Sequence, residues 1–327
     1  MITGIGMTLA AAGGCGLGWD DVAFVGRDDV VLGLPAARAG VTRGEVHERV
    51  TRTASAIDGW IGGVVDEAAI AVAEVEGHRE TRRDGRFALY GPFDDAQERD
   101  LAWLVKLDGD DRHGMFELWA GRRGATEADL ALVLAGDVDT RDGQRRGQLE
   151  LRFDAIDLLP ALRPEADARF AGAVGVEFTR ARSEGAADVA LEFREFVRED
   201  DAGTTWRASD TFVYERDAAG GGAFHLALAS ADDLPIVGEL GVDDVDRVEL
   251  DLRWDAEPAG RARASVRAAA NPDGALPHGD LLVHECFDAA GGLTWRELNG
   301  PYAAESPSYA LGDAASCVFA APDLDVP

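Results

Sequence analysis

Alternation of apolar and polar residues with a period of two runs through most of this sequence from about residue 87 onward. The segment 149–154 reads Leu-Glu-Leu-Arg-Phe-Asp, and the same pattern recurs at 174–178, 189–193 and 248–254. Successive side chains of a strand point to opposite faces, so each of these segments predicts a strand with one apolar and one polar face. Such strands are typical of antiparallel sheets that face water on one side.

Short turns rich in Asp and Gly separate the predicted strands. Residues 108–111 (Asp-Gly-Asp-Asp) lie between the alternating segments 101–105 and 115–119, which predicts a hairpin. Roughly a dozen strands follow one another in this way, which is too many for a flat sheet. We therefore predict an α+β fold that is mainly β: a large curled antiparallel meander, either a half-barrel or a sandwich, with an N-terminal helix packed on it.

The predicted helix precedes the strands. Thr42 and Glu45 stand three residues apart, as in a capping box, and apolar residues recur at helical spacing from Val46 to Val64. Because glycine disfavours helix interiors, the pair Gly62-Gly63 predicts a weak point or an end, with a second helix over 65–75.

We expect residues 19–327 to form one mainly-β domain, preceded by a signal or anchor segment at 1–18. Residues 155–170, which contain two prolines, predict a short helix and loop that interrupt the strands. The segment 230–244, with Pro235 and two glycines, is the best candidate for a subdomain boundary.

Charges also alternate between neighbouring predicted strands. Glu249 and Asp251 lie on the polar side of one strand, and Arg261, Arg263 and Arg267 lie on the polar side of the next. We expect cross-strand charge pairs on this face, each contributing a few tenths of a kcal/mol.

The composition is strongly acidic. Asp and Glu total 61 against 32 for Lys and Arg, and the formal net charge is -29. This charge repels nucleic acids and anionic membrane surfaces, so neither is an expected partner. Lys106 is the only lysine, which indicates a GC-rich genome. The same acidic, lysine-poor composition also suits a cytoplasmic protein of a salt-loving organism.

The N-terminal segment 1–14 is uncharged and rich in small residues, and it leads directly into Cys15. A bacterial lipoprotein signal has an apolar stretch, then small residues, then the cysteine that receives the lipid, so Cys15 is our candidate for lipid attachment. The basic residues expected at the start of a secretory signal are missing. The alternative is that residues 1–18 form a flexible or strand-forming N-terminus in which Cys15 is merely small and buried. No run of about 20 apolar residues that could form a membrane-spanning helix follows it.

Cys286 and Cys317 are separated by 31 positions near the C-terminus. If they lie on neighbouring strands, a disulfide between them would stabilise the fold by roughly 3–4 kcal/mol in the chain-entropy model. Such a bond persists only in an oxidising compartment. The alternative is two unpaired core cysteines in a cytoplasmic protein.

The C-terminal segment 284–319 contains the tetrapeptide Glu-Cys-Phe-Asp (285–288), a following aromatic residue, and then Gly-Asp before Cys-Val-Phe (317–319). Together with the Cys15 region, it resembles uncharacterised predicted lipoproteins of GC-rich Gram-negative bacteria. The resemblance implies a cell-envelope location and the pairing of Cys286 with Cys317. It implies no activity.

No catalytic or cofactor motif is recognised. A phosphate-binding loop needs a lysine after a glycine-rich turn, whereas Lys106 lies inside a predicted strand; the hydrolase pattern G-x-S-x-G does not occur. His278, His284 and Cys286 are the closest approach to a zinc-ligand set, but a strand histidine beside a disulfide explains them better. Residues 137–143 resemble part of a calcium loop without its closing glutamate, and an acidic hairpin tip is the simpler interpretation. We therefore predict no metal, no cofactor and no catalytic residue.

Three hypotheses about function remain. The first is a structural or interaction lipoprotein of the cell envelope, anchored through Cys15 and facing the periplasm or the cell surface, with a protein as its partner. The second is a carrier that binds an apolar ligand in the curled sheet. The third is a cytoplasmic protein of a halophile with an unknown activity.

Overall fold

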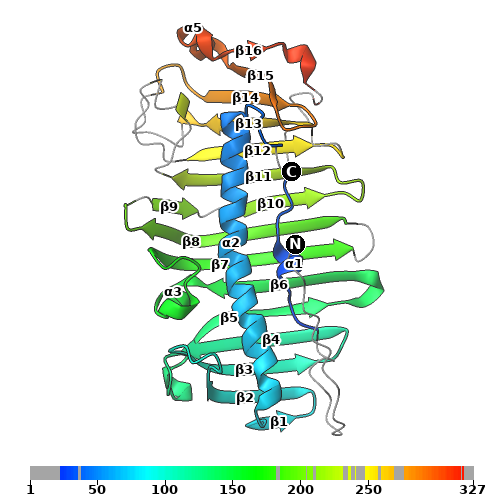
Figure 1. Cartoon of the computed structure of the whole chain (residues 1–327), viewed down its shortest axis with the longest axis vertical. Coiled ribbons are helices and arrows are strands. Elements are labelled where there is room, and N and C mark those ends of the chain that lie inside the picture. Colours follow the sequence, from blue (N-terminus) through cyan, green and yellow to red (C-terminus); the bar gives the residue numbers. More distant parts are fainter. Residues whose placement is uncertain are drawn as a thin grey trace.

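All described strands of the computed structural model belong to one open, curled antiparallel sheet, with a long helix lying across one of its faces (Figure 1). The prediction of a mainly-β, curled antiparallel meander with an N-terminal helix is therefore confirmed. The sandwich alternative is wrong, because the strands form one sheet. The structure describes residues 23–35, 38–181, 185–203, 205–208, 211–230, 235–236, 240, 247–256, 259–268, 276–317 and 319.

The 16 strands follow the chain almost in order. Each strand pairs with its predecessor and its successor, except that β9 lies beside the main path and pairs with both β8 and β11. The strands are β1 (Arg82–Asp84), β2 (Phe87–Asp94), β3 (Ala102–Gly109), β4 (His113–Gly121), β5 (Ala131–Asp139), β6 (Gln144–Arg152), β7 (Ala168–Ala181), β8 (Ala187–Asp200), β9 (Thr205–Ala208), β10 (Thr211–Arg216), β11 (Gly222–Ser230), β12 (Val248–Trp254), β13 (Gly260–Val266), β14 (Leu281–Phe287), β15 (Leu293–Leu298) and β16 (Leu311–Gly312).

Among the helices, α2 (Glu45–Glu74) is by far the longest. Its 30 residues span about 45 Å and run across the strands of the sheet (Figure 1). No helix in the described part of the chain is long and apolar enough to cross a membrane. The shorter helices are α1 (Arg27–Val30), α3 (Phe153–Asp157) and α5 (Gly300–Glu305), and the 3-10 turns are η2 (Val75–Gly77), η3 (Glu127–Asp129), η4 (Arg141–Gly143), η5 (Pro160–Leu162), η7 (Pro307–Tyr309) and η8 (Ala314–Ser316).

Helix α2 runs without interruption through Gly62-Gly63, so the predicted break there is wrong. Gly62 is buried, and a Cβ atom at that position would lie only 3.0 Å from the guanidinium carbon of Arg27. A glycine costs a helix about 1 kcal/mol relative to alanine. Burial of neighbouring residues such as Ile61 and Val65 against the sheet outweighs that cost.

The predicted capping box at the start of α2 is also wrong. The N-cap is Gly44, and no side chain of the helix itself caps it. Instead, the backbone N–H groups of Val46 and His47 each donate to one carboxylate oxygen of Glu285 on β14, at 3.1 Å. A Cβ atom at residue 44 would collide with that carboxylate, so glycine is required where the chain passes over Glu285.

The apolar core fills the space between α2 and the sheet. Trp60 packs with Phe170 and Phe196 at ring-centroid distances of 6.0 and 5.5 Å. A hollow beneath α2, lined by Val64 and Trp103 among others, measures only about 10 Å³. We call the side of the sheet that α2 covers the covered face, and the opposite side the open face.

Residues 23–35, which we call the strap, run beside α2 on the covered face (Figure 1). Arg145 on β6 donates to Asp29 and to the Phe24 carbonyl at 2.7–2.8 Å. The backbone N–H of Leu32 donates to Asp58 of α2 at 2.8 Å, and burial raises the pKa of that carboxyl group to about 7. The strap therefore ties α2 to the centre of the sheet.

Both edges of the sheet end in very short strands. At one edge β1 has three exposed residues, and at the other β16 has two. Short edge strands limit pairing with other chains. Within the sheet, β11 pairs with β12, so the sheet continues across the segment 230–244, most of which lies outside the described residues.

Candidate functional site

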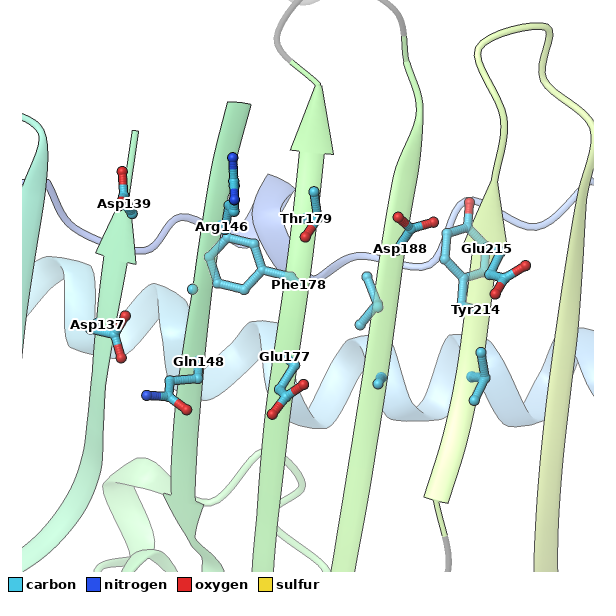
Figure 2. A pocket seen from close by; sticks show the side chains of 14 residues that line it. Asp137, Asp139, Arg146, Gln148, Glu177, Phe178, Thr179, Asp188, Tyr214 and Glu215 are labelled. Carbon is cyan, nitrogen blue, oxygen red and sulfur yellow. The ribbon is translucent and has the colours of Figure 1, made fainter. Parts of the chain in front are cut away.

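Three hollows on the open face join into one groove that crosses the middle of the sheet. Their volumes are about 330, 510 and 470 Å³, and neighbouring hollows share Asp137 as a lining residue. Figure 2 shows the last of them, with the strands in front and helix α2 behind them. We define the groove by its lining on β2–β8 and β10: Phe87 and the segments 106–108, 115–117, 135–137, 146–150, 175–179, 188–194 and 211–215.

Small side chains form the floor of the groove. Ala135, Gly175, Ala190 and Val213 lie on the open face of β5, β7, β8 and β10. Their neighbours along each strand point to the covered face, where larger residues such as Val176 are buried. The length of the side chains determines how far the surface of a sheet lies above its backbone. A row of small residues between longer polar ones therefore leaves a hollow.

Carboxylates line the walls around this floor. Asp137, Glu177, Asp188 and Glu215 come from four different strands, and Figure 2 shows all four on the open side. None of the four forms an ion pair with any residue that the structure describes. Arg146 is the only basic residue that lines the same hollow. This part of the groove therefore has a strongly negative potential.

The register of the strands places two of these acids directly opposite each other. Asp188 on β8 is the cross-strand partner of Glu215 on β10. Like charges in opposite positions of an antiparallel pair destabilise a sheet. This arrangement costs the folded protein free energy, and nothing within the described residues offsets it by pairing.

The other end of the groove is balanced in charge. Lys106, the only lysine, lies 2.8 Å from Glu117 on the next strand and 4.7 Å from the ring centroid of Trp119. Burial of Glu117 works against ionisation, but hydrogen bonds from Lys106 and Trp119 outweigh it and lower the pKa of that carboxyl group. At the opposite wall Arg194 donates to Glu150 at 2.8 Å and thereby lowers the pKa of Glu150.

The cysteines predicted to pair do pair. Cys286 on β14 and Cys317 form a disulfide with a Cα–Cα distance of 5.5 Å. The bond holds the C-terminal segment over the open face of β13–β15, where Arg261 donates to the Phe319 carbonyl at 3.0 Å. Cys15, the predicted lipid-attachment residue, lies outside the described residues.

The weaker candidate sites from the sequence are not assembled. His278 pairs with Glu305 at 2.6 Å, and His284 lies 6.2 Å from the ring centroid of Trp295 while Cys286 is occupied by the disulfide. Residues 137–139 are the end of β5, and residues 140–143 form the turn that leads into β6. Within the described part of the chain, no group of three or more His, Cys, Asp or Glu residues could hold a metal ion.

The groove was not predicted from the sequence. Its signal was present as small residues on the polar side of alternating strands, such as Gly175 between Val174 and Val176. Taken strand by strand these positions look unremarkable, and only the register brings them into one row.

Comparisons with known proteins do not identify a relative. No protein-family model matches the sequence, and no curated protein or solved structure matches it either. The chemistry of the groove must therefore be argued from its own residues. The lining that the structure describes contains carboxylates, guanidinium groups and small apolar side chains, which suit binding of a polar or charged partner.

Proposed function

We propose that this protein is a non-catalytic interaction protein of the cell envelope, and that it binds a partner polypeptide in the groove on its open face. The observation that carries the proposal is the combination of a hollowed sheet face with four acids, Asp137, Glu177, Asp188 and Glu215, that form no ion pair within the described chain. A protein that only needed a stable sheet would gain from pairing these acids or removing them.

The envelope location rests on two features of the chain. The Cys286–Cys317 disulfide is stable only where the surroundings are oxidising. The N-terminal segment with Cys15 has the order of elements of a lipoprotein signal. Lipid on Cys15 would hold the protein at a membrane surface, facing the periplasm or the cell exterior.

The alternative of an apolar-ligand carrier has less support. Such a carrier needs an apolar cavity of several hundred Å³. The apolar side of the sheet is occupied by α2, where the hollow at Val64 and Trp103 measures about 10 Å³. A ligand could enter there only if α2 moved away together with the capping contact to Glu285. The halophile alternative predicts free thiols at Cys286 and Cys317, so the disulfide counts against it.

Site-specific photo-crosslinking in the native host tests the binding role. We expect a photoreactive residue at Ala190, on the floor of the groove, to form an adduct with a polypeptide. The matched control is Ala304 on α5, which is exposed but far from the groove along the sheet. Adducts at neither position, or the same adducts at both, would contradict the proposal.

Thiol alkylation of the unfolded protein, purified from its host without reduction, tests the location. We expect Cys286 and Cys317 to resist alkylation until a reductant is added, as read from the intact mass. Immediate alkylation of both would contradict the envelope location. It would not affect the conclusion about partner binding, which depends on the crosslinking result.

A further inference from the structure

We propose that the groove binds an extended segment of a partner protein that is rich in arginine or lysine. The proposal rests on the interaction role proposed above and names the chemistry of the partner. Three properties of the groove lead to it: its length, its lack of free backbone groups, and the distribution of its charges.

The length of the groove fits a short polypeptide. The lining comes from eight neighbouring strands, β2 to β8 and β10, which are separated by seven inter-strand spacings. At about 4.8 Å per spacing the groove is roughly 34 Å long. An extended chain covers this distance with about ten residues at 3.3 Å each. A single metal ion or a small solute would occupy only a fraction of it.

The groove can recognise such a segment only through side chains. Each of its eight strands is hydrogen-bonded to a neighbour on both sides. The two edge strands, β1 and β16, lie at the ends of the sheet and contribute no lining residue (Figure 1). The partner therefore cannot add as a further strand there. It must lie across the strands, as α2 does on the covered face, and its own side chains must make the contacts.

The charges decide the composition of the partner. Glu177, Asp188 and Glu215 lie within three neighbouring strands, and Asp188 and Glu215 face each other. A guanidinium or ammonium group placed between them would replace a repulsion by two attractions. The contribution of such exposed pairs is moderate and salt-dependent, which suits a reversible interaction. Small floor residues such as Ala190 leave room for the aliphatic part of an arginine or lysine side chain.

The rest of the open face provides an internal comparison. On β12 and β13 the acids Glu249 and Asp251 are matched by Arg267 and Arg263 of the same chain, at 3.4 and 2.9 Å. At these positions the chain supplies the cations itself, as it does for Glu117 and Glu150 elsewhere in the groove. For Glu177, Asp188 and Glu215 the partner supplies them.

Peptide binding to the whole protein tests the inference. The probe is a fluorescent ten-residue peptide with arginine at every second position and proline between, which cannot form an α-helix. Its matched control has glutamate in place of arginine. Fluorescence anisotropy is measured at low salt and at about 150 mM salt. We expect the arginine peptide to bind, the glutamate peptide not to bind, and the affinity to fall as salt rises.

Two triple variants with the same change in net charge locate the binding. The groove variant carries Glu177→Gln, Asp188→Asn and Glu215→Gln. The control carries Glu76→Gln, Asp84→Asn and Glu127→Gln, three exposed acids outside the groove. We expect the groove variant to weaken binding about tenfold and the control less than about twofold. Far-UV circular dichroism and urea unfolding confirm that both variants fold.

Other outcomes overturn the inference in distinguishable ways. Equal weakening by both variants would mean that the peptide responds only to net charge. Tighter binding of the glutamate peptide would assign the groove to a different class of partner, and displacement of the arginine peptide by micromolar Ca²⁺ would assign it to a metal. If Ala190 crosslinks a polypeptide in the host but neither peptide binds, the interaction role stands and the basic, extended partner is wrong.

Discussion

Two regions of the same sheet face treat their acidic residues in opposite ways. On β12 and β13, Asp251 is only 2% exposed and lies 2.9 Å from Arg263 and 2.7 Å from His225. On β8 and β10, Asp188 is exposed and faces another acid, Glu215. The first region satisfies its charges within the chain, as the alternation of acidic and arginine-rich strands predicts. In the second region the acids are exposed to solvent and available to a partner.

The two regions also differ in what covers them. Over β13–β15 the C-terminal segment is held by the Cys286–Cys317 disulfide, and Trp295 beneath it is 4% exposed. In the groove, by contrast, Asp188 and Glu215 are exposed. The two parts of this face therefore differ in how accessible they are. The part over β13–β15 is covered by a disulfide-linked segment, whereas the acids of the groove are exposed.

The largest expected effect on stability comes from removing the acid in the locked region. Asp251→Asn takes a carboxylate away from Arg263 and His225 in a nearly buried site, and we expect it to lower the free energy of unfolding by about 3 kcal/mol. Urea unfolding followed by tryptophan fluorescence measures this. A loss below about 1 kcal/mol would mean that the contacts of Asp251 with Arg263 and His225 do not stabilise the sheet. The two regions would then not differ in how their acids affect stability.

The same variant has a local readout. The hydrogen bond to Asp251 raises the pKa of His225 above its usual value. In Asp251→Asn we expect the pKa of His225, followed by NMR, to fall. An unchanged pKa in a folded variant would place the stabilising contact elsewhere.

A buried acid on the covered face extends the comparison, because Glu285 has backbone amides as partners instead of arginine. It is fully buried and caps α2, and burial raises its pKa to about 7 despite the hydrogen bonds from Val46 and His47. Glu45, Arg296 and Tyr309 are the other titratable or charged groups around it.

The sign of the pH effect follows from that raised pKa. The folded protein holds the Glu285 proton up to about pH 7, whereas the unfolded chain releases it near pH 4.5. The contribution of this group to stability is therefore fully present below pH 4.5 and is lost as pH rises through 7. Glu285→Gln keeps an oxygen for the two amides without the charge.

We expect the free energy of unfolding of Glu285→Gln, relative to the natural protein, to rise by about 2 kcal/mol between pH 5 and pH 8. Urea unfolding of both proteins across this range measures the difference. His47, whose pKa is lowered to about 4 by burial, titrates in both proteins, so its effect cancels to first order. A constant difference across the range would show that Glu285 is ionised throughout and that the cap tolerates the charge.

The sequence predicts the strands well and the contacts between distant segments poorly. Alternation at 149–152 and 248–254 correctly marked part of β6 and all of β12, because a half-buried strand must alternate whatever its neighbours are. The alternation continues over Phe153 and Asp154, but these two residues begin helix α3, so the predicted strand was too long there. The cap of α2 could not be found in this way, since its partner Glu285 is 239 positions from Val46. The predicted capping box with Thr42 was based on nearby residues only, and it does not form.

The groove escaped prediction for a related reason. The alternation assigns Asp188 and Glu215 to polar faces, but only the pairing of β8 with β10 places them opposite each other. The charge pairs on β12 and β13 were predictable because those strands follow each other through a short turn. Between β8 and β10 the chain forms β9, which pairs with residues 196–199 of β8, while β10 pairs with residues 187–192 of the same strand. The partner of Asp188 is therefore not on the next strand in sequence.

The smallest expected change in the free energy of unfolding tests the difference between the two regions most directly, because its sign is opposite to that of Asp251→Asn. Asp188→Asn removes one of two facing like charges in an exposed position, so we expect it to raise the free energy of unfolding by a few tenths of a kcal/mol. The double variant Asp188→Asn with Glu215→Gln should add almost nothing further, because the first substitution already removes the repulsion. Urea unfolding at low salt resolves the difference, and high salt should reduce it. A loss of stability in Asp188→Asn would mean that this carboxylate has a favourable role in the folded chain itself, and the acids of the groove would then need no partner to explain them.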